Sequence, residues 1–544
     1  NEDCPRSGWP RGLVPGKFEE FNILYKDGFL SKDYVFSIFN EKIRYEAIAL
    51  FKLFYFAKDF DTFYKTAAYA RVHFNDHMFY YSLYVAIFHR EDTQGIVVPA
   101  PYEVFPEFFT NMETIYKAYR IKMQDSIINA EDAKFNGIVK EDKYYVIYSN
   151  YSDYWTYGEE ESRLSYFTED IGLNAYYYFY HSYLPFWMQT TDKFSILKER
   201  RGEFYYFFYQ QLLSRYYMER LSNGLGEIPD FSWNHPLYTQ YKPHLTTSAH
   251  PFAQRPEYFY MQTEQNIEYL RLIAPSALSF YMTSARDPAF YQLYSKIMKY
   301  VLQYKEHLQP YTKDNLHYVG VKINEVAVSK LETYYDYYDY EINNALYASA
   351  DELKGEYPVF KVRQPRLDHK PFTVTIDVKS DVEGDAVFKV FLGPKYNNKG
   401  YPINIEDNWQ NFIELDWFVH KLTSGQNKIE RKSEEFFYYK QDSLPTSKNY
   451  EWMPKRLMLP RGVEGGYPFQ LFVFVYPHET LPKEYEPFKS YFIDTKPMGY
   501  PFDRPVYEPY FHQPNIFVGT YSINHFPSPS FHLIHIYRWF SEMF

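Results

Sequence analysis

Hydrophobic residues recur at helical spacing through roughly the first two thirds of the chain. From about residue 35 to about residue 350 they follow one another at intervals of three and four, as Ile43 and Ala47 do, which predicts helices with one buried face. Asn40 and Asp59 each precede such a run and are residue types that cap helix N-termini. The sequence therefore predicts a long helical region, with two helices that begin after these residues.

One stretch inside this region cannot be a continuous helix. The segment HREDTQGIVVPAPYEVFPEFF contains Gly95, Pro99, Pro101 and Pro106. Proline fixes its own backbone and lacks an N–H, so three of them within eight residues exclude a regular helix. We expect an ordered connection here, with helices resuming around Thr110.

Beyond about residue 355 the hydrophobic period changes from helical to alternating. The segment 354–371 contains three prolines and is interpreted as a hinge between the two regimes. Residues 1–12 and 517–544 show no clear pattern and receive no assignment. The alternation of hydrophobic and polar residues beyond residue 355 predicts an antiparallel sandwich or barrel. The predicted strands are PFTVTIDVKS, DAVFKVFLG and PFQLFVFVYP.

The length and the ring content limit the possible architectures. A chain of 544 residues is too long for one hydrophobic core, which favours two to four domains. It holds 62 tyrosines, 49 phenylalanines and 8 tryptophans, or 22% aromatic residues. Because each buried ring covers roughly 150–250 Å², the cores cannot use them all, so we expect many rings at subunit interfaces.

Charge and cysteine content exclude several classes of protein. The net charge is −11, and no basic stripe follows the chain, so we expect no nucleic-acid partner. No apolar run approaches 18 residues, and we expect no membrane insertion. The single cysteine, Cys4, excludes an intrachain disulfide framework. A single cysteine mildly favours a reducing compartment. The glycosylation sequon Asn150-Tyr151-Ser152 favours secretion instead, so residue chemistry alone leaves the compartment open.

Histidines are the first candidates for chemistry, because imidazole suits copper. His73 and His77 have the spacing of a helical metal pair, but Asn75 and Asp76 between them favour a junction of two helices. His181 stands alone in NAYYYFYHSYLPFW, and a lone histidine is more often a packing residue than a ligand.

The acidic clusters favour structural interpretations over catalytic ones. GEEES at 158–162 is interpreted as solvated loop charge. Asp336 and Asp339 in ETYYDYYDYE could bind a cation, but a charged helical face is the favoured interpretation. The sequence has no G-x-S-x-G elbow, phosphate-binding loop, H-E-x-x-H or dinucleotide motif.

Several longer motifs resemble one family. YFAKDFDTFYKTAAYAR, HREDTQGIVVPAPYEVFPEFF, YFTEDIGLNAYYYFYHSYLPFW, RDPAFYQLY, KRLMLPRGVEGGYPFQLFVFVYP and MGYPFDRPV resemble the arthropod hemocyanin superfamily, and within it the arylphorin-type hexamerins. The resemblance runs from about residue 25 to about residue 510. It implies an α+β multidomain chain and a hexamer of like subunits. The implied domains are an N-terminal helical domain (1–155), a central helical domain with a four-helix bundle and a lost copper site (156–358), and a C-terminal immunoglobulin-like antiparallel β-sandwich (359–544).

The same resemblance identifies degenerate copper-ligand positions. Tyr177 and His181 stand where hemocyanins carry two histidines for the first copper, and Tyr209 stands at its third ligand. Tyr294 replaces a ligand of the second copper, whose other histidine pair has no counterpart between residues 262 and 285, where the chain is also shorter than the family pattern. A neutral phenol, with a pKa near 10, is a poor copper ligand. We therefore expect no metal and no cofactor.

These observations favour a non-enzymatic storage protein of insect haemolymph, secreted and hexameric, whose cargo is its own tyrosine and phenylalanine. The first alternative is a carrier of small apolar ligands such as hormones. A copper oxygen carrier or phenoloxidase is the third. We expect homo- or hetero-hexamers, an uptake receptor as a further candidate partner, and a glycan at Asn150 as the candidate modification.

Overall fold

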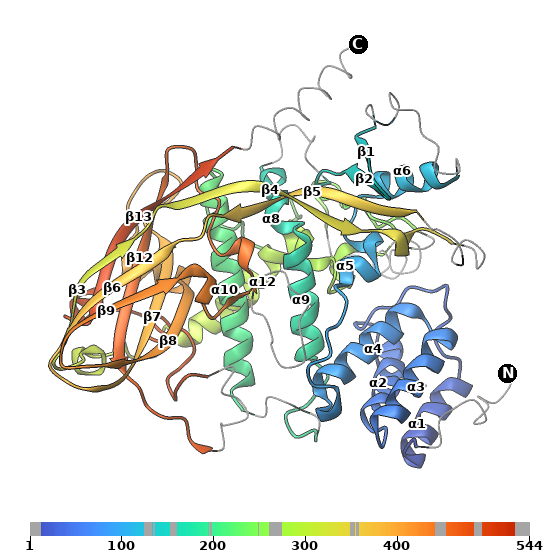
Figure 1. Cartoon of the computed structure of the whole chain (residues 1–544), viewed down its shortest axis with the longest axis horizontal. Helices are drawn as coiled ribbons and strands as arrows, with labels where there is room; N and C mark the ends of the chain where they lie inside the picture. The colour runs from blue at the N-terminus through green and yellow to red at the C-terminus, as the bar shows by residue number, and fades with distance from the viewer. Residues whose placement is uncertain are drawn as a thin grey trace, which may run out of the picture.

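The computed structural model describes residues 12–123, 133, 136–152, 160–193, 195, 199–247, 250–260, 275–348, 354, 358–440, 453–483 and 492–527. Figure 1 shows a compact group of N-terminal helices at the lower right, long helices in the centre and a β-structure at the left. A pair of long strands, β4 (Leu331–Glu341) and β5 (Val359–His369), crosses from the β-structure over the central helices. No helix among the described residues is long and apolar enough to cross a bilayer.

The N-terminal group confirms the expected helix starts. The side chain of Asn40 accepts a hydrogen bond from the Ile43 amide, and that of Asp59 accepts one from the Thr62 amide, so both residues cap helices. Arg90 donates to three carbonyls at the C-terminal end of the second helix, including that of Phe54 at 2.9 Å. The helices are α1 (Pro15–Lys26), α2 (Glu41–Tyr55), α3 (Phe60–His73) and α4 (Asp76–His89).

The proline-rich connection is ordered, as the sequence predicts. It forms two short helical turns, α5 (Pro101–Val104) and η3 (Pro106–Phe108), each beginning at a proline. A regular helix resumes at α6 (Met112–Met123), close to the expected position, and a hairpin of β1 (Ile138–Glu141) and β2 (Tyr144–Tyr148) follows.

Three long helices of the central domain lie within the described residues: α9 (Ile171–Tyr183), α10 (Arg201–Ser222) and α12 (Pro288–Lys305). Every residue of α9 is buried, because neighbouring elements cover all of its faces. The helix begins at Asp170, whose side chain accepts from the Leu173 amide at 2.9 Å. Of the shorter helices, α8 (Ser165–Thr168) precedes α9 and α13 (Lys313–Leu316) follows α12, whereas α14 (Ile405–Asn408) belongs to the β-structure.

The β-structure consists of two sheets with a shared core and a separate, short parallel pair of strands, β10 (Tyr439–Lys440) and β11 (Met453–Pro454). An eight-stranded sheet has the order β1-β2-β5-β4-β13-β12-β7-β8, and a three-stranded sheet has the order β3-β6-β9. Val374 and Ile376 of the small sheet and Phe388 and Val390 of the large sheet are fully buried in one cluster, which confirms the sandwich. Most pairs are antiparallel, but β2–β5 and β13–β4 are parallel. The remaining strands are β3 (Val321–Val328), β6 (Thr373–Ser380), β7 (Gly384–Pro394), β8 (Ile413–Leu422), β9 (Gly425–Lys432), β12 (Tyr467–Pro477) and β13 (Ile516–Phe526).

Two secondary-structure predictions are wrong. The region expected to be helical up to residue 350 ends in strands β3 and β4, and the segment expected to be a hinge is strand β5. Tyrosines occupy both faces of β4, so the run lacks the two-residue alternation that signals a strand. Pro365 lies beyond the last β5 residue paired with β2, at a strand edge that tolerates proline. The sequence assigned nothing to the segment 517–544, but its first residues, 517–526, belong to strand β13, which pairs with β12 and β4.

Buried ion pairs join the central helices to the C-terminal domain. Arg366 of β5 donates to both carboxylate oxygens of Asp170, at 2.7 and 2.9 Å, and both side chains are fully buried. Arg215 of α10 pairs with Glu219 at 2.6 Å and also donates to the carbonyl of Leu457. These contacts hold α9 and α10 in register with the β-structure, because a buried charge that loses its partner is costly.

Candidate functional site

The four positions that the sequence singles out in the central domain converge in space. Tyr177 and His181 lie one turn apart on α9, Tyr209 lies on α10 and Tyr294 on α12. Tyr177 and Tyr209 are almost fully buried, with exposures of 1% and 0%. We call these four residues the ring cluster.

The hydroxyls of the ring cluster are hydrogen-bonded to one another. The Tyr177 and Tyr209 oxygens are 2.8 Å apart, and Tyr177 donates to the hydroxyl of Tyr294 at 3.3 Å. The Tyr209 hydroxyl lies 3.2 Å from Nε2 of His181. Because three of the four side chains are phenols, the cluster satisfies most of its polar atoms internally.

Aromatic contacts fill the remaining volume. The rings of Tyr209 and Tyr294 stack with centroids 4.0 Å apart, and His181 stacks on Tyr281 at 3.9 Å. Phe290 meets Tyr177 edge-on at 5.1 Å. Such pairs add packing energy beyond the buried area alone. The ring cluster is therefore a continuous part of the hydrophobic core.

Burial decides the protonation of these groups. Desolvation lowers the pKa of His181 to about 3, so its imidazole is neutral at physiological pH. Desolvation also raises the pKa of Tyr177 and of Tyr209 well above its usual value, and the neighbouring tyrosines add to the effect. Nδ1 of His181 is buried without a hydrogen-bond partner among the described residues. The cluster is electrically neutral.

Copper does not fit this donor set. A copper site of the hemocyanin kind needs several neutral imidazoles, whereas the ring cluster offers one, and its Nε2 is within hydrogen-bonding distance of the Tyr209 hydroxyl. The phenols would have to lose protons that burial makes them hold. Among the described residues, no group of three or more His, Cys, Asp or Glu side chains is arranged so that it could hold a metal ion.

The His73/His77 pair lies at a junction between two helices, as the intervening residues indicate. His73 ends α3, is exposed, and stacks on Tyr69 at 3.9 Å. His77 lies in the first turn of α4 and stacks on Phe105 at 3.9 Å. Desolvation lowers the pKa of His77 to about 3. The two imidazoles have separate aromatic partners and form no metal pair.

Asp336 and Asp339 lie on a strand, so the helical face expected for them is wrong. Three residues apart on β4, they point to opposite faces of the sheet. Asp339 accepts two hydrogen bonds from Arg363, at 2.8 and 2.7 Å, and Arg363 also pairs with Glu141. The alternation of the strand separates the two carboxylates, which excludes the cation site considered from the sequence.

The acidic run 158–162 is only partly a solvated loop. Glu160 is exposed, but Glu161 is buried, pairs with Arg220 and accepts from the Tyr216 hydroxyl at 2.5 Å. The interpretation as solvated charge is therefore wrong for Glu161, because the tertiary fold supplies an arginine from α10. Residues 158 and 159 lie outside the described residues, as does Cys4.

The glycosylation sequon follows β2. Asn150 is half-buried, and the Tyr151 hydroxyl donates to the carbonyl of Pro365 at 2.5 Å. The amide of Ser152 donates to Glu169 at 2.8 Å, and its hydroxyl donates to the same carboxylate. The fold thus holds the sequon against the central domain.

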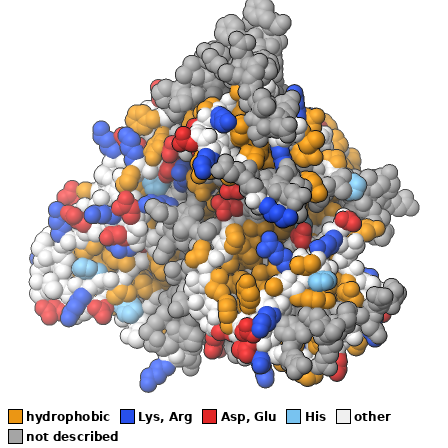
Figure 2. All heavy atoms as spheres, turned by 45° about the vertical axis from the view of Figure 1, so that its right-hand side comes forward, with side chains coloured by type: hydrophobic (Ala, Val, Ile, Leu, Met, Phe, Trp, Pro, Cys, Tyr) orange, Lys and Arg blue, Asp and Glu red, His pale blue; other side chains and the backbone are white. Residues whose placement is uncertain are grey.

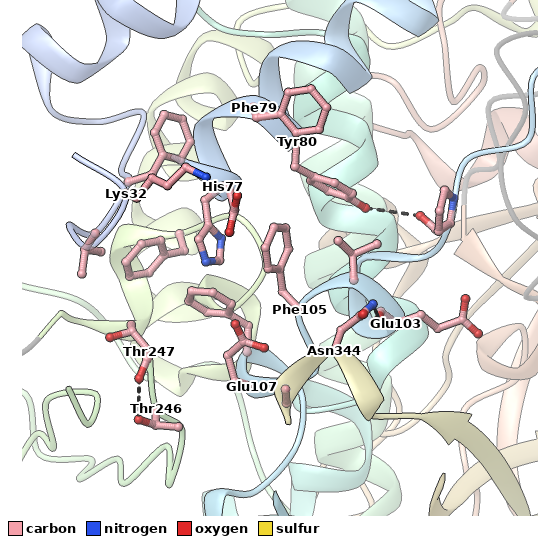
Figure 3. A pocket seen from close by; sticks show the side chains of 18 of the residues that line it. Lys32, His77, Phe79, Tyr80, Glu103, Phe105, Glu107, Thr246, Thr247 and Asn344 are labelled. Carbon is pink, nitrogen blue, oxygen red and sulfur yellow. Dashed lines mark hydrogen bonds between the residues drawn. The ribbon is translucent and has the colours of Figure 1, made fainter. Parts of the chain in front are cut away.

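A large cavity, which the sequence did not indicate, lies where the N-terminal helices meet the proline-rich connection. Its volume is about 1110 Å³. Figure 3 shows His77, Phe105 and Glu107 directed into the same space, with Lys32, Thr247 and Asn344 around it. These residues are far apart in sequence, so only the tertiary fold reveals the cavity. We call it the interdomain cavity.

Family profiles match almost the whole chain. The profile described as "Hemocyanin, all-alpha domain" matches residues 14–95, "Hemocyanin, copper containing domain" matches 100–275 and 268–301, and "Hemocyanin, ig-like domain" matches 310–453 and 447–525. The chain belongs to the hemocyanin family.

Arylphorin subunit alpha of Manduca sexta is 48% identical over 93% of this chain and 85% of its own length. Arylphorin subunit beta of the same species is 46% identical over the same shares, and hexamerin 70b of Apis mellifera is 33% identical over 90% and 84%. Within the hemocyanin family the chain is therefore an arylphorin-type hexamerin, a non-enzymatic storage protein of insect haemolymph. The alignment with subunit alpha runs over 600 positions although the chain has 544 residues, so the chain has gaps relative to this hemocyanin-family relative.

Two solved structures share the fold of this chain. A scorpion hemocyanin is 26% identical, with a TM-score of 0.77 over 94% of this chain and 96% of the other. A crustacean hemolymph-type prophenoloxidase is 21% identical, with a TM-score of 0.79 over 95% and 92%. The likeness to the prophenoloxidase concerns the fold alone.

Proposed function

We propose that this storage protein assembles with like subunits into a hexamer whose usable cargo is its own aromatic amino acids. The observation that carries the proposal is the composition, with 22% aromatic residues across the chain. Relatives named as alpha and beta subunits and as a hexamerin support assembly, in homo- or hetero-hexamers.

Solubility gives this form of storage a physical advantage. Free tyrosine dissolves poorly, whereas a folded chain with a net charge of −11 keeps many rings in solution as one particle. Burial of rings such as Tyr177 and Tyr209 in the core raises the amount stored without exposing apolar surface. The storage function then depends on the amino-acid composition itself.

The ring cluster is proposed to be a copper site that has become core. Tyr177, His181, Tyr209 and Tyr294 stand at the ligand positions in this interpretation, and their mutual hydrogen bonds support it. The domain limits 1–155, 156–358 and 359–544 belong to the same proposal, as does a glycan on Asn150.

Exposed rings offer a surface for assembly. Tyr45, Phe60 and Tyr64 on the N-terminal helices α2 and α3 are 53%, 45% and 64% exposed. Apolar side chains also lie between charged ones on the face shown in Figure 2. Interfaces enrich aromatic residues in this way, so these helices are proposed to contact neighbouring subunits.

Two measurements test the proposal. Native mass spectrometry should give a particle of six subunits with substoichiometric copper, and a glycan mass that Asn150→Gln removes. Protein labelled in its tyrosine rings, injected into larvae, should deliver the label to new tissue and cuticle. A monomer, two coppers per chain, or label excreted without incorporation would contradict the proposal.

A second candidate function, carriage of small apolar ligands, is favoured by one observation. The interdomain cavity is larger than the 300–1,000 Å³ typical of small-molecule sites, and most of its wall residues are apolar or aromatic. Storage and carriage are compatible in one protein, because they use different parts of it.

A further inference from the structure

The interdomain cavity combines aromatic walls with an excess of carboxylates. Its lining includes nine aromatic rings, among them Tyr80, Phe105 and Phe108. It also includes five carboxylates but only two cationic side chains, Lys32 and Arg71. Within the described part of the chain, none of the five carboxylates forms an ion pair that would neutralise it. The carboxylates are Asp33, Asp76, Glu103, Glu107 and Glu341.

Glu107 is the inner carboxylate of this cavity. It lies in η3 of the proline-rich connection, between Phe105 and Phe108, which both line the cavity. Its Oε2 is buried and has no hydrogen-bond partner among the described residues. The Glu107 side chain is half-buried at the cavity wall, so a ligand that donates a hydrogen bond to its carboxylate would satisfy an acceptor that is costly to leave unpaired.

The wall beside Glu107 is rigid. His77 stacks on Phe105 at 3.9 Å and meets Phe108 edge-on at 4.8 Å. Phe108 also packs against Phe280 at 5.4 Å. Figure 3 shows the His77 and Phe105 rings next to the Glu107 carboxylate. A ring face and a carboxylate together are the elements that recognise an organic ammonium group, by cation–π attraction and a charge-assisted hydrogen bond.

The carboxylates at the entrance of the cavity also favour a cationic ligand. Glu103 and Glu341 are close enough that their repulsion, with burial, raises the pKa of Glu103. Asp33, Asp76 and Glu341 are exposed at the rim. A cluster of one sign attracts ligands of the opposite sign and repels those of its own. The cavity therefore disfavours carboxylic acids and favours amines.

We propose that the interdomain cavity binds bulky hydrophobic amines, with the ammonium group on Glu107 and the apolar body against the rings of Tyr80, Phe105 and Phe108. This inference rests on the carrier candidate and goes beyond storage, since the chain can store amino acids whether or not the cavity is filled. The large volume favours a body of several fused rings or a long chain over a small amine.

Three pyrene derivatives that differ only in their polar group test the proposal: pyrenemethylamine, pyrenemethanol and pyrenecarboxylate. Binding to the purified full-length assembly is followed by pyrene fluorescence anisotropy at about pH 8, above the pKa of about 7 of Glu107, and at wavelengths where tyrosine and tryptophan do not absorb. The amine should bind at least about 10-fold more tightly than the alcohol, as a charge-assisted hydrogen bond gives, and the carboxylate most weakly.

Two variants locate the site. Glu107→Gln keeps the shape, so it should lower amine affinity to that of the alcohol and leave the alcohol unchanged. Leu83→Trp, which narrows the cavity, should weaken both probes. Glu434→Gln, an exposed carboxylate on the distant β-structure, is the matched control and should change nothing. Thermal melting and native mass confirm that each variant folds and assembles.

Each other outcome overturns the proposal. Equal binding of the three probes, preference for the carboxylate, or no binding up to the solubility limit would show that the cavity does not select amines. Amine binding that survives both Glu107→Gln and Leu83→Trp would place the site elsewhere. Native mass and tyrosine delivery are measured separately, so failure of amine binding is distinct from failure of assembly or storage.

Discussion

Replacing Asp170 by alanine removes two structural functions at once. Its carboxylate caps α9 through the Leu173 amide and holds Arg366 with two hydrogen bonds, with both side chains fully buried. Loss of the cap costs about 0.5–2 kcal/mol. Leaving a buried arginine without its carboxylate costs about 3–5 kcal/mol. We therefore expect Asp170→Ala to lower the free energy of unfolding by about 3.5–7 kcal/mol.

A double-variant cycle separates the pair from the cap. Arg366→Met should also be strongly destabilising, because the Asp170 carboxylate stays buried without its cation. Asp170→Asn with Arg366→Met should recover most of the loss, since no unpaired charge remains and asparagine still caps the helix. Asp61→Ala, which breaks the exposed pair with Lys65, should change stability by less than about 0.5 kcal/mol.

Urea denaturation followed by near-ultraviolet circular dichroism measures these differences, at one subunit concentration because assembly contributes to stability. Amide hydrogen exchange in α9 provides a local reading of the same effect. If Asp170→Ala cost less than about 1 kcal/mol, or the double variant were no better than the singles, a buried pair joining the domains would be refuted.

Three further predictions concern single positions. Burial and the nearby Asp76 raise the pKa of Glu107 from 4.5 to about 7, so the free energy of unfolding should fall as the pH rises between these two values. In urea titrations, Glu107→Gln should remove this pH dependence and raise the free energy of unfolding by about 1–2 kcal/mol above pH 7. Phe290→Ala should cost about 3–5 kcal/mol in the same assay, because Phe290 is 1% exposed and packs against Tyr177 of the ring cluster. A cost below about 1 kcal/mol would refute tight packing there. Gly462→Ala should lower the melting temperature far more than Gly425→Ala, because both have positive φ but only at Gly462 would a Cβ overlap the backbone of β13; equal effects would contradict this.

Local signals predicted the parts of the fold that depend on neighbouring residues. Asn40 and Asp59 cap helices because a side-chain oxygen reaches an amide only three residues away. Val374 and Ile376 of β6 fall on one buried face because alternation is a property of any strand. The long family motifs and the aromatic composition led to a storage protein of the hemocyanin family.

Local signals failed where distant partners decide the structure. The tyrosine-rich run around Asp336 is a strand because β5 and β13 pair with it on its two sides, and no short-range pattern encodes those partners. Glu161 is buried because Arg220 of α10 meets it, although its neighbours in sequence are those of a solvated loop.

The sequence by itself determined the family, the storage composition and the identity of the four side chains in the ring cluster. Only the tertiary structure brought Tyr177, Tyr209 and Tyr294 from three helices into hydrogen-bonding distance, and only it enclosed the interdomain cavity around Glu107. The physical reason is that composition and helix caps can be read from the sequence directly or from residues close together in it. A buried cluster or cavity depends instead on which elements, often far apart in the sequence, pack together and exclude water.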